Sequence, residues 1–269
     1  MEPFELFAIR YANLSGRLEA DNYIGGDPHE AGSDLDYFIW VARRSDALFV
    51  IDTGFGTEQA RIRKRDLLRL PAQGLALLGI DAAQVDRVIL THLHYDHAGT
   101  MNDFPRARFH VQDGEAAFAT GRCMCHAHMR HAFAVEDVVS FVRCLYAGRI
   151  SFHDGVEELA PGLTVHRTGG HTAGLQVVRV FTKRGWVVVA SDASHLYVNM
   201  DNRLPFPVVH SVADMLEGHN LVFRLADSPD HVVPGHDPLV MKLYPPVSAE
   251  LAGIAVRLDE APNPERVRS

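Results

Sequence analysis

Residues 90–99 read Leu-Thr-His-Leu-His-Tyr-Asp-His-Ala-Gly, and a valine and an isoleucine precede them. This apolar β-branched start predicts a buried strand that ends where the polar residues begin. Side chains of an extended chain alternate in direction, so His92, His94 and Asp96 begin on one side, and a turn can bring His97 to the same point. Imidazole and carboxylate groups bind zinc and other divalent first-row metals. The stretch therefore predicts a metal site at a strand end.

The composition excludes several classes of protein. A chain of 269 residues with 47% hydrophobic and 22% charged residues can bury a sizeable core, and we expect one domain over residues 1–269. The net charge of −8 disfavours a nucleic-acid partner. No apolar run approaches the roughly 18 residues of a membrane span, and no secretory signal pattern opens the chain. Three cysteines, an odd number, fit free thiols in a reducing compartment. We therefore expect a soluble cytoplasmic protein without a membrane partner.

Hydrophobic periodicity predicts alternating groups of strands and helices. Strands are expected at 4–12, 37–51 (as a hairpin), 108–111, 162–168, 175–182, 186–190 and 230–234, and helices at 58–78 (interrupted at Pro71), 113–120, 136–147 and 211–226. Residues 121–149 are rich in cysteine and histidine, which leaves two interpretations open. One is a second metal site, although the spacing lacks the pairs typical of structural zinc. The other, which we favour, is a helical insertion at about 113–149 that covers the pocket.

The pattern His-x-His-x-Asp-His after an apolar strand closely resembles the metallo-β-lactamase superfamily of metal-dependent hydrolases. That family also has a later histidine, an aspartate that ends another strand and a last histidine near the C-terminus. His171 in Gly-Gly-His-Thr, Asp192 after a predicted strand and His236 in Pro-Gly-His-Asp match these positions in order. The resemblance implies an α/β fold, an αββα sandwich in which two mixed β-sheets pack face to face and are flanked by helices.

The resemblance also implies a set of metal ligands and two divalent metal ions. Zn²⁺ is the first choice, with iron, manganese or cobalt as alternatives. One ion would be held by His92, His94 and His171, the other by Asp96, His97 and His236, and Asp192 would bridge them together with a water or hydroxide. Two cations roughly 3.5–4 Å apart lower the pKa of a shared water and polarise a carbonyl or phosphoryl oxygen.

The residue type at position 192 indicates which groups of the superfamily the chain resembles. Zinc β-lactamases usually have cysteine or serine there, whereas glyoxalase II, acyl-homoserine lactonases and several phosphodiesterases and nucleases have a carboxylate. The N-acyl-homoserine lactonases resemble the chain most closely, through residues 91–99, Gly-His at 170–171, Asp-Ala-Ser at 192–194 and Gly-His-Asp at 235–237. This resemblance implies a quorum-quenching hydrolase that opens the ester bond of a small-molecule lactone by attack of a metal-bridging hydroxide.

The chain departs from these lactonases at one position. They have a tyrosine three residues after the bridging aspartate, whereas this chain has His195. An imidazole can donate a hydrogen bond or a proton near neutral pH, so we expect His195 to stabilise the oxyanion or protonate the leaving alkoxide. Tyr95 and Tyr197 are alternative donors. The predicted catalytic residues are Asp96, Asp192 and His195.

Other functions remain as alternatives at this level. A glyoxalase II-like thioesterase or another carboxylic-ester hydrolase would use the same ligands, but glyoxalase II normally has a basic C-terminal segment, whereas residues 242–269 mix arginines with acidic clusters. A nuclease needs a basic groove, which the charge of −8 disfavours. A non-enzymatic binding module would be expected to lack a ligand, and none is missing. The sequence leaves a homodimer open.

Overall fold

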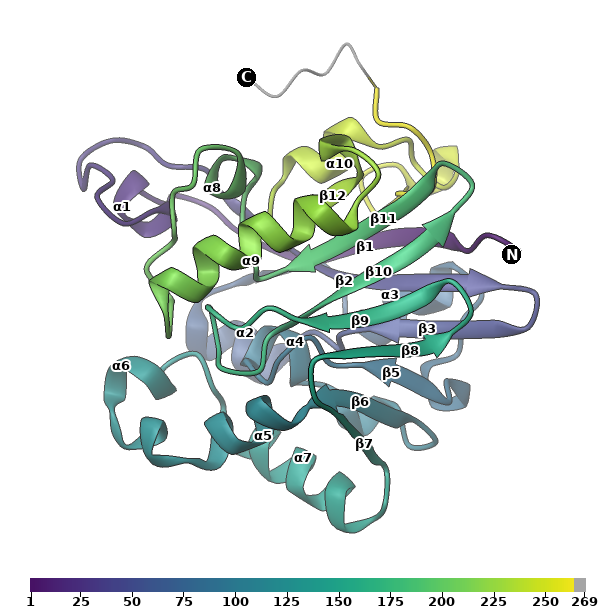
Figure 1. Ribbon diagram of the computed structural model, residues 1–269, viewed down its shortest axis with the longest axis horizontal. Helices are drawn as coiled ribbons and strands as arrows, with labels where there is room; N and C mark the ends of the chain where they lie inside the picture. Colours follow the sequence, from purple (N-terminus) through teal and green to yellow (C-terminus); the bar gives the residue numbers. More distant parts are fainter. Residues whose placement is uncertain (264–269) are drawn as a thin grey trace.

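The computed structural model describes residues 1–263, and two β-sheets form its centre (Figure 1). One sheet has eight strands, in the order β13-β1-β2-β3-β5-β6-β7 with β4 paired to β1, and the other has five, in the order β12-β11-β10-β9-β8. Both are mixed, because β3, β5, β6 and β7 pair in parallel in the first and β11 pairs in parallel with β12 in the second. The αββα sandwich expected from the sequence is confirmed.

The strands of the first sheet are β1 (Glu5–Leu14), β2 (Leu35–Arg44), β3 (Ala47–Ile51), β4 (Asp66–Leu67), β5 (Arg87–Ile89), β6 (Arg108–Gln112), β7 (Ile150–His153) and β13 (Ala255–Arg257). Those of the second are β8 (Val156–Ala160), β9 (Leu163–Arg167), β10 (Gln176–Thr182), β11 (Gly185–Ser191) and β12 (Val232–Pro234). The predicted hairpin over residues 37–51 is present as β2 and β3.

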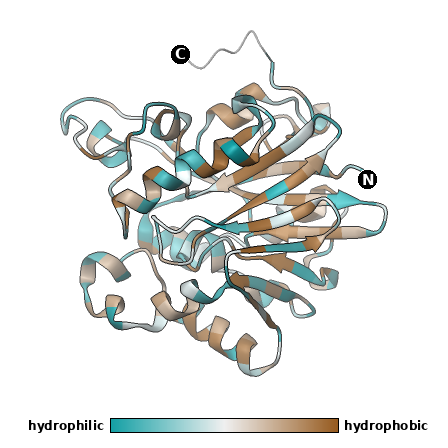
Figure 2. Cartoon of the chain, in the orientation of Figure 1, coloured by the Kyte–Doolittle hydropathy of each residue, from teal (hydrophilic) through white to brown (hydrophobic). Residues whose placement is uncertain are grey.

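Both faces of the first sheet are buried, because alternate residues of its strands point in opposite directions. Along β1, Leu6 and Ala8 pack into the core that also contains the valines of the second sheet. Phe7 and Ile9 point the other way, into a core that includes residues of the helices. Figure 2 shows hydrophobic residues concentrated along the strands. The alternation therefore explains why the sheets pack against each other and why helices cover the outer face.

The helices are α1 (Glu19–Asn22), α2 (Thr57–Arg63), α3 (Pro71–Leu77), α4 (Tyr95–Ala98), α5 (Asp113–Thr120), α6 (Ala127–Arg130), α7 (Val135–Tyr146), α8 (Tyr197–Asp201), α9 (Val212–Leu225) and α10 (Leu239–Leu243). Short 3-10 helices are η1 (Ala82–Gln84), η2 (Met101–Asp103), η3 (Arg122–Cys125), η4 (Pro229–His231) and η5 (Ala249–Leu251). No helix in residues 1–263 is long and apolar enough to cross a membrane.

The segment predicted as an interrupted helix over 58–78 contains two helices and a short strand. Helix α2 ends at Arg63 because Lys64 adopts a left-handed conformation with φ of 54°. Strand β4 then pairs with β1, and α3 begins at Pro71, whose ring fixes a helical φ and needs no hydrogen-bond donor at this position. This change of direction brings Arg63 and Arg65 to the pocket described below.

Residues 113–149 form α5, η3, α6 and α7 and connect the parallel strands β6 and β7. In Figure 1 these helices lie together at one end of the molecule. No group of three metal-ligating side chains comes together within 121–149 in the part of the chain that the structure describes. That 113–149 is an insertion relative to the family stays a prediction, as does the single-domain organisation.

Candidate metal centre

The candidate ligands lie at the carboxyl ends of strands from both sheets. The first four follow β5, with Asp96 and His97 in the single turn of α4. His171 lies between β9 and β10, Asp192 directly after β11, and His236 two residues after β12. Because β11 and β12 are parallel neighbours, their carboxyl ends lie at the same edge of the second sheet. The packing of the sheets brings this edge to the turn after β5.

Two glycines permit close approach of these loops. Gly170 has a φ of 89°, and a Cβ there would lie 2.6 Å from Met215 Cα on α9. A Cβ on Gly235 would lie 2.8 Å from Asp192 Oδ1. Any larger residue would therefore displace His171 or Asp192.

The Asp192 carboxylate is the centre of the cluster. Its Oδ1 atom lies 3.0 Å from His236 Nε2 and 3.3 Å from His97 Nε2. Its Oδ2 atom lies 3.2 Å from His171 Nε2, and that nitrogen is 2.8 Å from His94 Nδ1. The seven predicted ligands are thus brought together. The ligating atoms of His92, His94 and His171, and those of Asp96, His97 and His236, form two groups in which all atoms lie within 4.8 Å of one another.

Hydrogen bonds orient the histidines so that one ring nitrogen points into the cluster. His97 Nδ1 lies 2.7 Å from Asp52 Oδ2. His171 Nδ1 lies 2.6 Å from the Val208 carbonyl, and His236 Nδ1 lies 2.9 Å from the Asp36 carbonyl. A carbonyl can only accept, so in the last two rings Nδ1 carries a hydrogen and Nε2 is the nitrogen that faces the cluster. This is the usual support of a metal-binding histidine.

Asp52 is fixed in turn by the strand end that delivers the ligands. Its Oδ1 accepts a hydrogen bond from the Thr91 backbone at 2.7 Å, and its Oδ2 accepts one from the Thr91 hydroxyl at 2.8 Å. Asp52 has a φ of 62°, a conformation that aspartate and asparagine tolerate better than most residues. The turn that follows β3 therefore holds His97 directly through the Asp52 side chain.

The charges around Asp192 match a bound cation. Burial lowers the pKa of His92 and His94 well below the usual value, so both are neutral and can coordinate a metal. Burial also disfavours a charge on His97, but Asp192 and Asp96 outweigh it and raise the pKa of His97 well above its usual value. The carboxylates thus attract one positive charge to this point, which a metal ion can supply in place of the proton.

Buried polar atoms without hydrogen-bond partners are a second observation that fits bound metal ions. His92 Nε2, His97 Nε2 and Asp192 Oδ1 are buried and form no hydrogen bond within residues 1–263. Buried polar atoms without a partner are costly unless another group satisfies them. Nitrogen and carboxylate donors at one point are the ligands that zinc and related metals take. These residues therefore fit two divalent metal ions.

Glu115 on α5 was not predicted from the sequence, yet it connects both parts of the cluster. The fully buried carboxylate accepts hydrogen bonds from the Leu93 backbone at 2.9 Å, the Thr172 hydroxyl at 2.6 Å and the Gly174 backbone at 3.2 Å. Leu93 lies between two ligands of the first turn, and Thr172 follows His171. Burial raises the pKa of Glu115, and these hydrogen bonds oppose that effect. One side chain therefore ties together two ligand loops.

The cluster opens into a cavity of about 100 Å³. Its walls include Tyr37 and Tyr95, and Tyr95 donates a hydrogen bond to the Tyr37 hydroxyl at 3.3 Å. Burial raises the pKa of Tyr37 to about 12 and that of Tyr95 well above its usual value, so both stay protonated at neutral pH. Tyr37 was predicted only as a strand residue, and its hydroxyl in the pocket had no signal in the sequence.

His195 also lines the cavity, but its ring is bound to neighbouring groups. Its Nε2 lies 2.9 Å from Asp192 Oδ2, and the ring stacks on Phe206 with 3.5 Å between centroids. Burial lowers the pKa of His195 to about 3, so the ring is neutral and Nε2 carries the hydrogen that faces the carboxylate. Of the alternative donors, Tyr95 lines the cavity, whereas Tyr197 is not among its walls.

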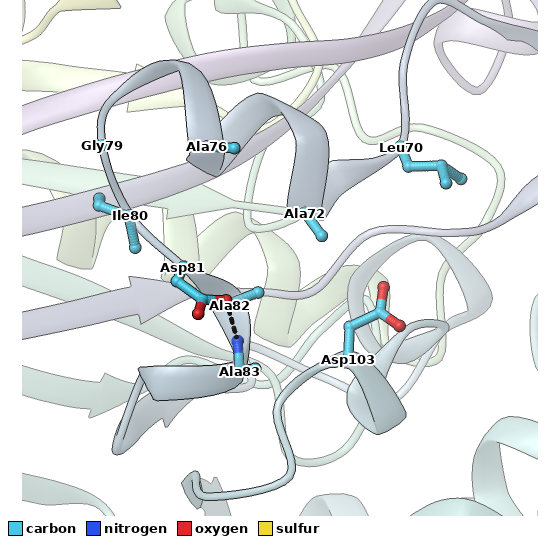
Figure 3. Close-up of a pocket in the computed structure, with 9 residues that line it drawn as sticks. All are labelled: Leu70, Ala72, Ala76, Gly79, Ile80, Asp81, Ala82, Ala83 and Asp103. Carbon is cyan, nitrogen blue, oxygen red and sulfur yellow. Dashed lines mark hydrogen bonds between the residues drawn. The ribbon is translucent and has the colours of Figure 1, made fainter.

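A larger cavity of about 610 Å³ lies elsewhere, between α3 and η1 (Figure 3). Its walls are mostly alanine, leucine and isoleucine, and its charged groups are Asp81 and Asp103. Asp81 accepts a hydrogen bond from the Ala83 backbone at 3.0 Å and so caps η1. None of the groups of possible metal ligands found in the described residues lies in this cavity.

Residues 33–236 match the family model of the metallo-beta-lactamase superfamily. The chain belongs to this superfamily. It is a metal-dependent hydrolase, as the sequence predicted. A probable metallo-hydrolase of Mycobacterium tuberculosis is 26% identical over 84% of this chain and 80% of its own length. An N-acyl homoserine lactonase of Agrobacterium fabrum is 27% identical over 62% of this chain and 66% of its own length.

Comparison with solved structures also gives a lactonase as a similar protein. The crystal structure of a quorum-quenching N-acyl homoserine lactone lactonase superposes with a TM-score of 0.74 at 20% identity, and covers 88% of this chain and 94% of that one. At this identity the likeness establishes a shared fold. The superfamily and its similarity to lactonases, both expected from the sequence, are confirmed.

Proposed function

We propose that this chain is a dinuclear metal-dependent lactonase that opens the ring ester of a small lactone. The proposed ligands are His92, His94 and His171 for one ion, Asp96, His97 and His236 for the other, and Asp192 between them. Zn²⁺ suits a set of imidazoles and carboxylates. When bound, two such cations lower the pKa of a water molecule and polarise the substrate carbonyl oxygen.

The observation that carries the proposal is the position of Asp192. The surrounding imidazoles, led by His236 and His97, overcome the effect of burial and hold the pKa of this carboxyl well below its usual range. Asp192 is therefore a permanent anion that can accept a hydrogen bond from water and orient it. A carboxylate here, together with the similarity to named lactonases, favours hydrolysis of an acyl ester.

The pocket offers one hydroxyl donor for the substrate, that of Tyr37. Because Tyr95 donates to the Tyr37 oxygen, the Tyr37 hydrogen can point to a carbonyl or leaving oxygen. His195 presents its hydrogen to Asp192, so we propose that it assists the reaction by holding that carboxylate. Direct proton donation by His195, the role predicted from the sequence, would require the ring to leave Asp192. Water adds across the acyl carbon–oxygen bond, which gives a carboxylate, a hydroxyl and one released proton.

The test is ring-opening turnover on a panel of lactones, followed with a pH indicator because one proton is released per ring opened. The panel contains acyl-homoserine lactones of several chain lengths and simple γ-lactones, and it is measured with wild type, Tyr37→Phe and His195→Gln. We expect turnover in wild type and a reduced kcat in both variants. A metal-loaded wild type that opens no lactone would contradict the proposal, and thioesters would then be the next substrates.

A further inference from the structure

Three arginines surround the cavity that contains the candidate metal centre. Arg17 comes from the loop after β1, Arg63 from the end of α2 and Arg65 from the turn before β4. All three are partly buried and line the same cavity as Asp192. Three positive charges therefore line one small pocket, although the net charge of the chain is −8.

The guanidinium groups are held in place by neutral groups. Arg17 Nε donates to Asn22 Oδ1 at 3.1 Å, Arg63 Nη2 to the Phe133 carbonyl at 3.1 Å, and Arg65 Nε to the Tyr95 hydroxyl at 3.1 Å. Within residues 1–263 none of the three forms an ion pair with a carboxylate. They are therefore fixed in position without a direct carboxylate partner, although the negative charges of Asp21 and Asp96 act on Arg17 and Arg65 respectively.

The charges of this arginine group act on one another. Burial lowers the pKa of Arg17, the negative charge of Asp21 opposes this effect, and the positive charge of Arg65 adds to the lowering. The carboxylates that share the cavity, Asp96 and Asp192, both point to the histidines, at 3.8 Å from His97 Nε2 and 3.0 Å from His236 Nε2 respectively. An anion that enters between the arginines would relieve this repulsion.

We infer that Arg17, Arg63 and Arg65 bind an anionic group of the substrate, so that the enzyme hydrolyses an acidic lactone or ester in preference to a neutral one. The guanidinium fork matches carboxylate and phosphate oxygens, and either anion fits the chemistry. This inference rests on the proposed ester hydrolysis, in which the anionic group takes no covalent part. It assigns a substrate class that the similarity to acyl-homoserine lactonases does not supply.

The size of the cavity supports a compact substrate. About 100 Å³ is well below the roughly 300–1,000 Å³ of pockets that enclose drug-sized ligands. A small ring with one anionic substituent places its charge near the arginines while its carbonyl stays near Tyr37 and Asp192. A long neutral acyl chain would have to extend out of the cavity.

The experiment compares three lactones that differ in one substituent. These are a γ-butyrolactone with a carboxylate on the ring carbon beside the ring oxygen, the same ring with a primary amide, and the same ring with a phosphonate. Turnover is measured for wild type, Arg65→Gln and Arg65→Lys, with Arg61→Gln as the matched control. Arg61 is an exposed residue of α2 outside the cavity walls. Binding of the ring-opened hydroxy-diacid and of its mono-amide is measured in parallel by calorimetry, which requires no turnover.

We expect wild type to prefer an anionic lactone to the amide by about tenfold or more in kcat/KM, since one charge-assisted hydrogen bond contributes about 1.5–3 kcal/mol. The preference should fall to near unity in Arg65→Gln, recover in part in Arg65→Lys and stay unchanged in Arg61→Gln. The anion with the larger preference identifies its class. Equal preference in wild type and Arg65→Gln would overturn the inference.

The two arms separate this inference from the proposed function. If no lactone is opened, the proposed lactonase activity fails, and calorimetry alone then decides. A hydroxy-diacid that binds wild type and Arg61→Gln about tenfold more tightly than Arg65→Gln supports an anion site. Equal binding by all three proteins overturns it.

Discussion

The candidate ligands from the two halves of the chain are assembled in different ways. The first four lie within residues 92–97, on one turn after β5. The other three, His171, Asp192 and His236, come from three separate loops of the second sheet. The first set is supported by a side chain, because Asp52 holds His97, whereas the carbonyls of Val208 and Asp36 hold His171 and His236. The orientation of His97 in the first set thus depends on one acidic side chain. The orientation of His171 and His236 in the second set depends on backbone carbonyls, and therefore on the fold.

Removing the charge of Asp192 should have the largest effect, because this residue joins the two sets. Asp192→Asn keeps the shape of the side chain but removes the anion that faces five imidazoles. We expect lactone hydrolysis to fall by about a hundredfold or more, since metal activation of water and carbonyl supplies several kcal/mol. Steady-state turnover and metal content by mass spectrometry measure it. Asp154→Asn, at an exposed position outside both sets, is the control and should stay at the wild-type level.

Asp52→Asn sharpens the comparison between side-chain and backbone support. Asparagine accepts a φ of 62°, so the backbone should be kept while the acceptor for His97 Nδ1 is weakened. Loss of such a partner typically reduces metal affinity or activity by about 10- to 100-fold. Asp36→Asn is the matched variant, because the Asp36 carbonyl that supports His236 remains. Competition with a chelator should show a large loss for Asp52→Asn and little loss for Asp36→Asn. Equal losses would contradict the distinction.

Glu115→Gln should lower the stability of the fold, because Glu115 connects the loops of both sets. The variant amide can accept with one oxygen only, so it leaves at least one of the donors Leu93 N–H, Thr172 O–H and Gly174 N–H buried without a partner. We expect a loss of about 1–3 kcal/mol in the free energy of unfolding, the cost of an unsatisfied buried group. Urea unfolding measures it. The exposed Glu136→Gln is the control, and an equal, small change in the two variants would show that Glu115 does not connect the loops.

The smallest expected effect concerns histidines outside both sets. His110 Nδ1 lies 3.0 Å from His153 Nε2 on neighbouring strands, and burial lowers the pKa of His110 to about 4. Because this folded pKa is below the unfolded value near 6.5, the neutral form favours folding. Its contribution is complete above pH 6.5 and is lost as the pH falls toward 4. His110→Gln should flatten the fall in Tm between pH 6.5 and 4.5 by about 2 °C or more. If Tm falls equally with pH in wild type and in His110→Gln, the titration of His110 does not contribute to stability.

The two sets also differ in how well the sequence predicts them. The order His-x-His-x-Asp-His after an apolar run is a local pattern, so it predicts both the metal site and the family from the sequence alone. His171, Asp192 and His236 were placed by their strand ends and by the family pattern, and the structure brings them to the same point. The sandwich followed from the same pattern, and alternation along β1 and β2 explains its two buried faces.

Residues whose role depends on packing between distant segments were missed. Glu115 lies in the first turn of α5, where an acid is ordinarily exposed and only caps the helix dipole. Arg17, Arg63 and Arg65 come from segments that meet only because β4 pairs with β1 after α2 ends at Arg63. A charged residue in a helix or loop gives no sign of which cavity it will line. These roles come from the topology and have no local signal.

The central claim is that both sets act together as one dinuclear centre. The most direct measurement is the number of metal ions per chain, by mass spectrometry after dialysis, in wild type, His94→Ala and His236→Ala. We predict about two ions per wild-type chain and about one in each variant, because His94 and His236 are proposed ligands of different ions. Wild-type protein that binds no metal, or variants that both keep two ions with unchanged turnover, would contradict the account.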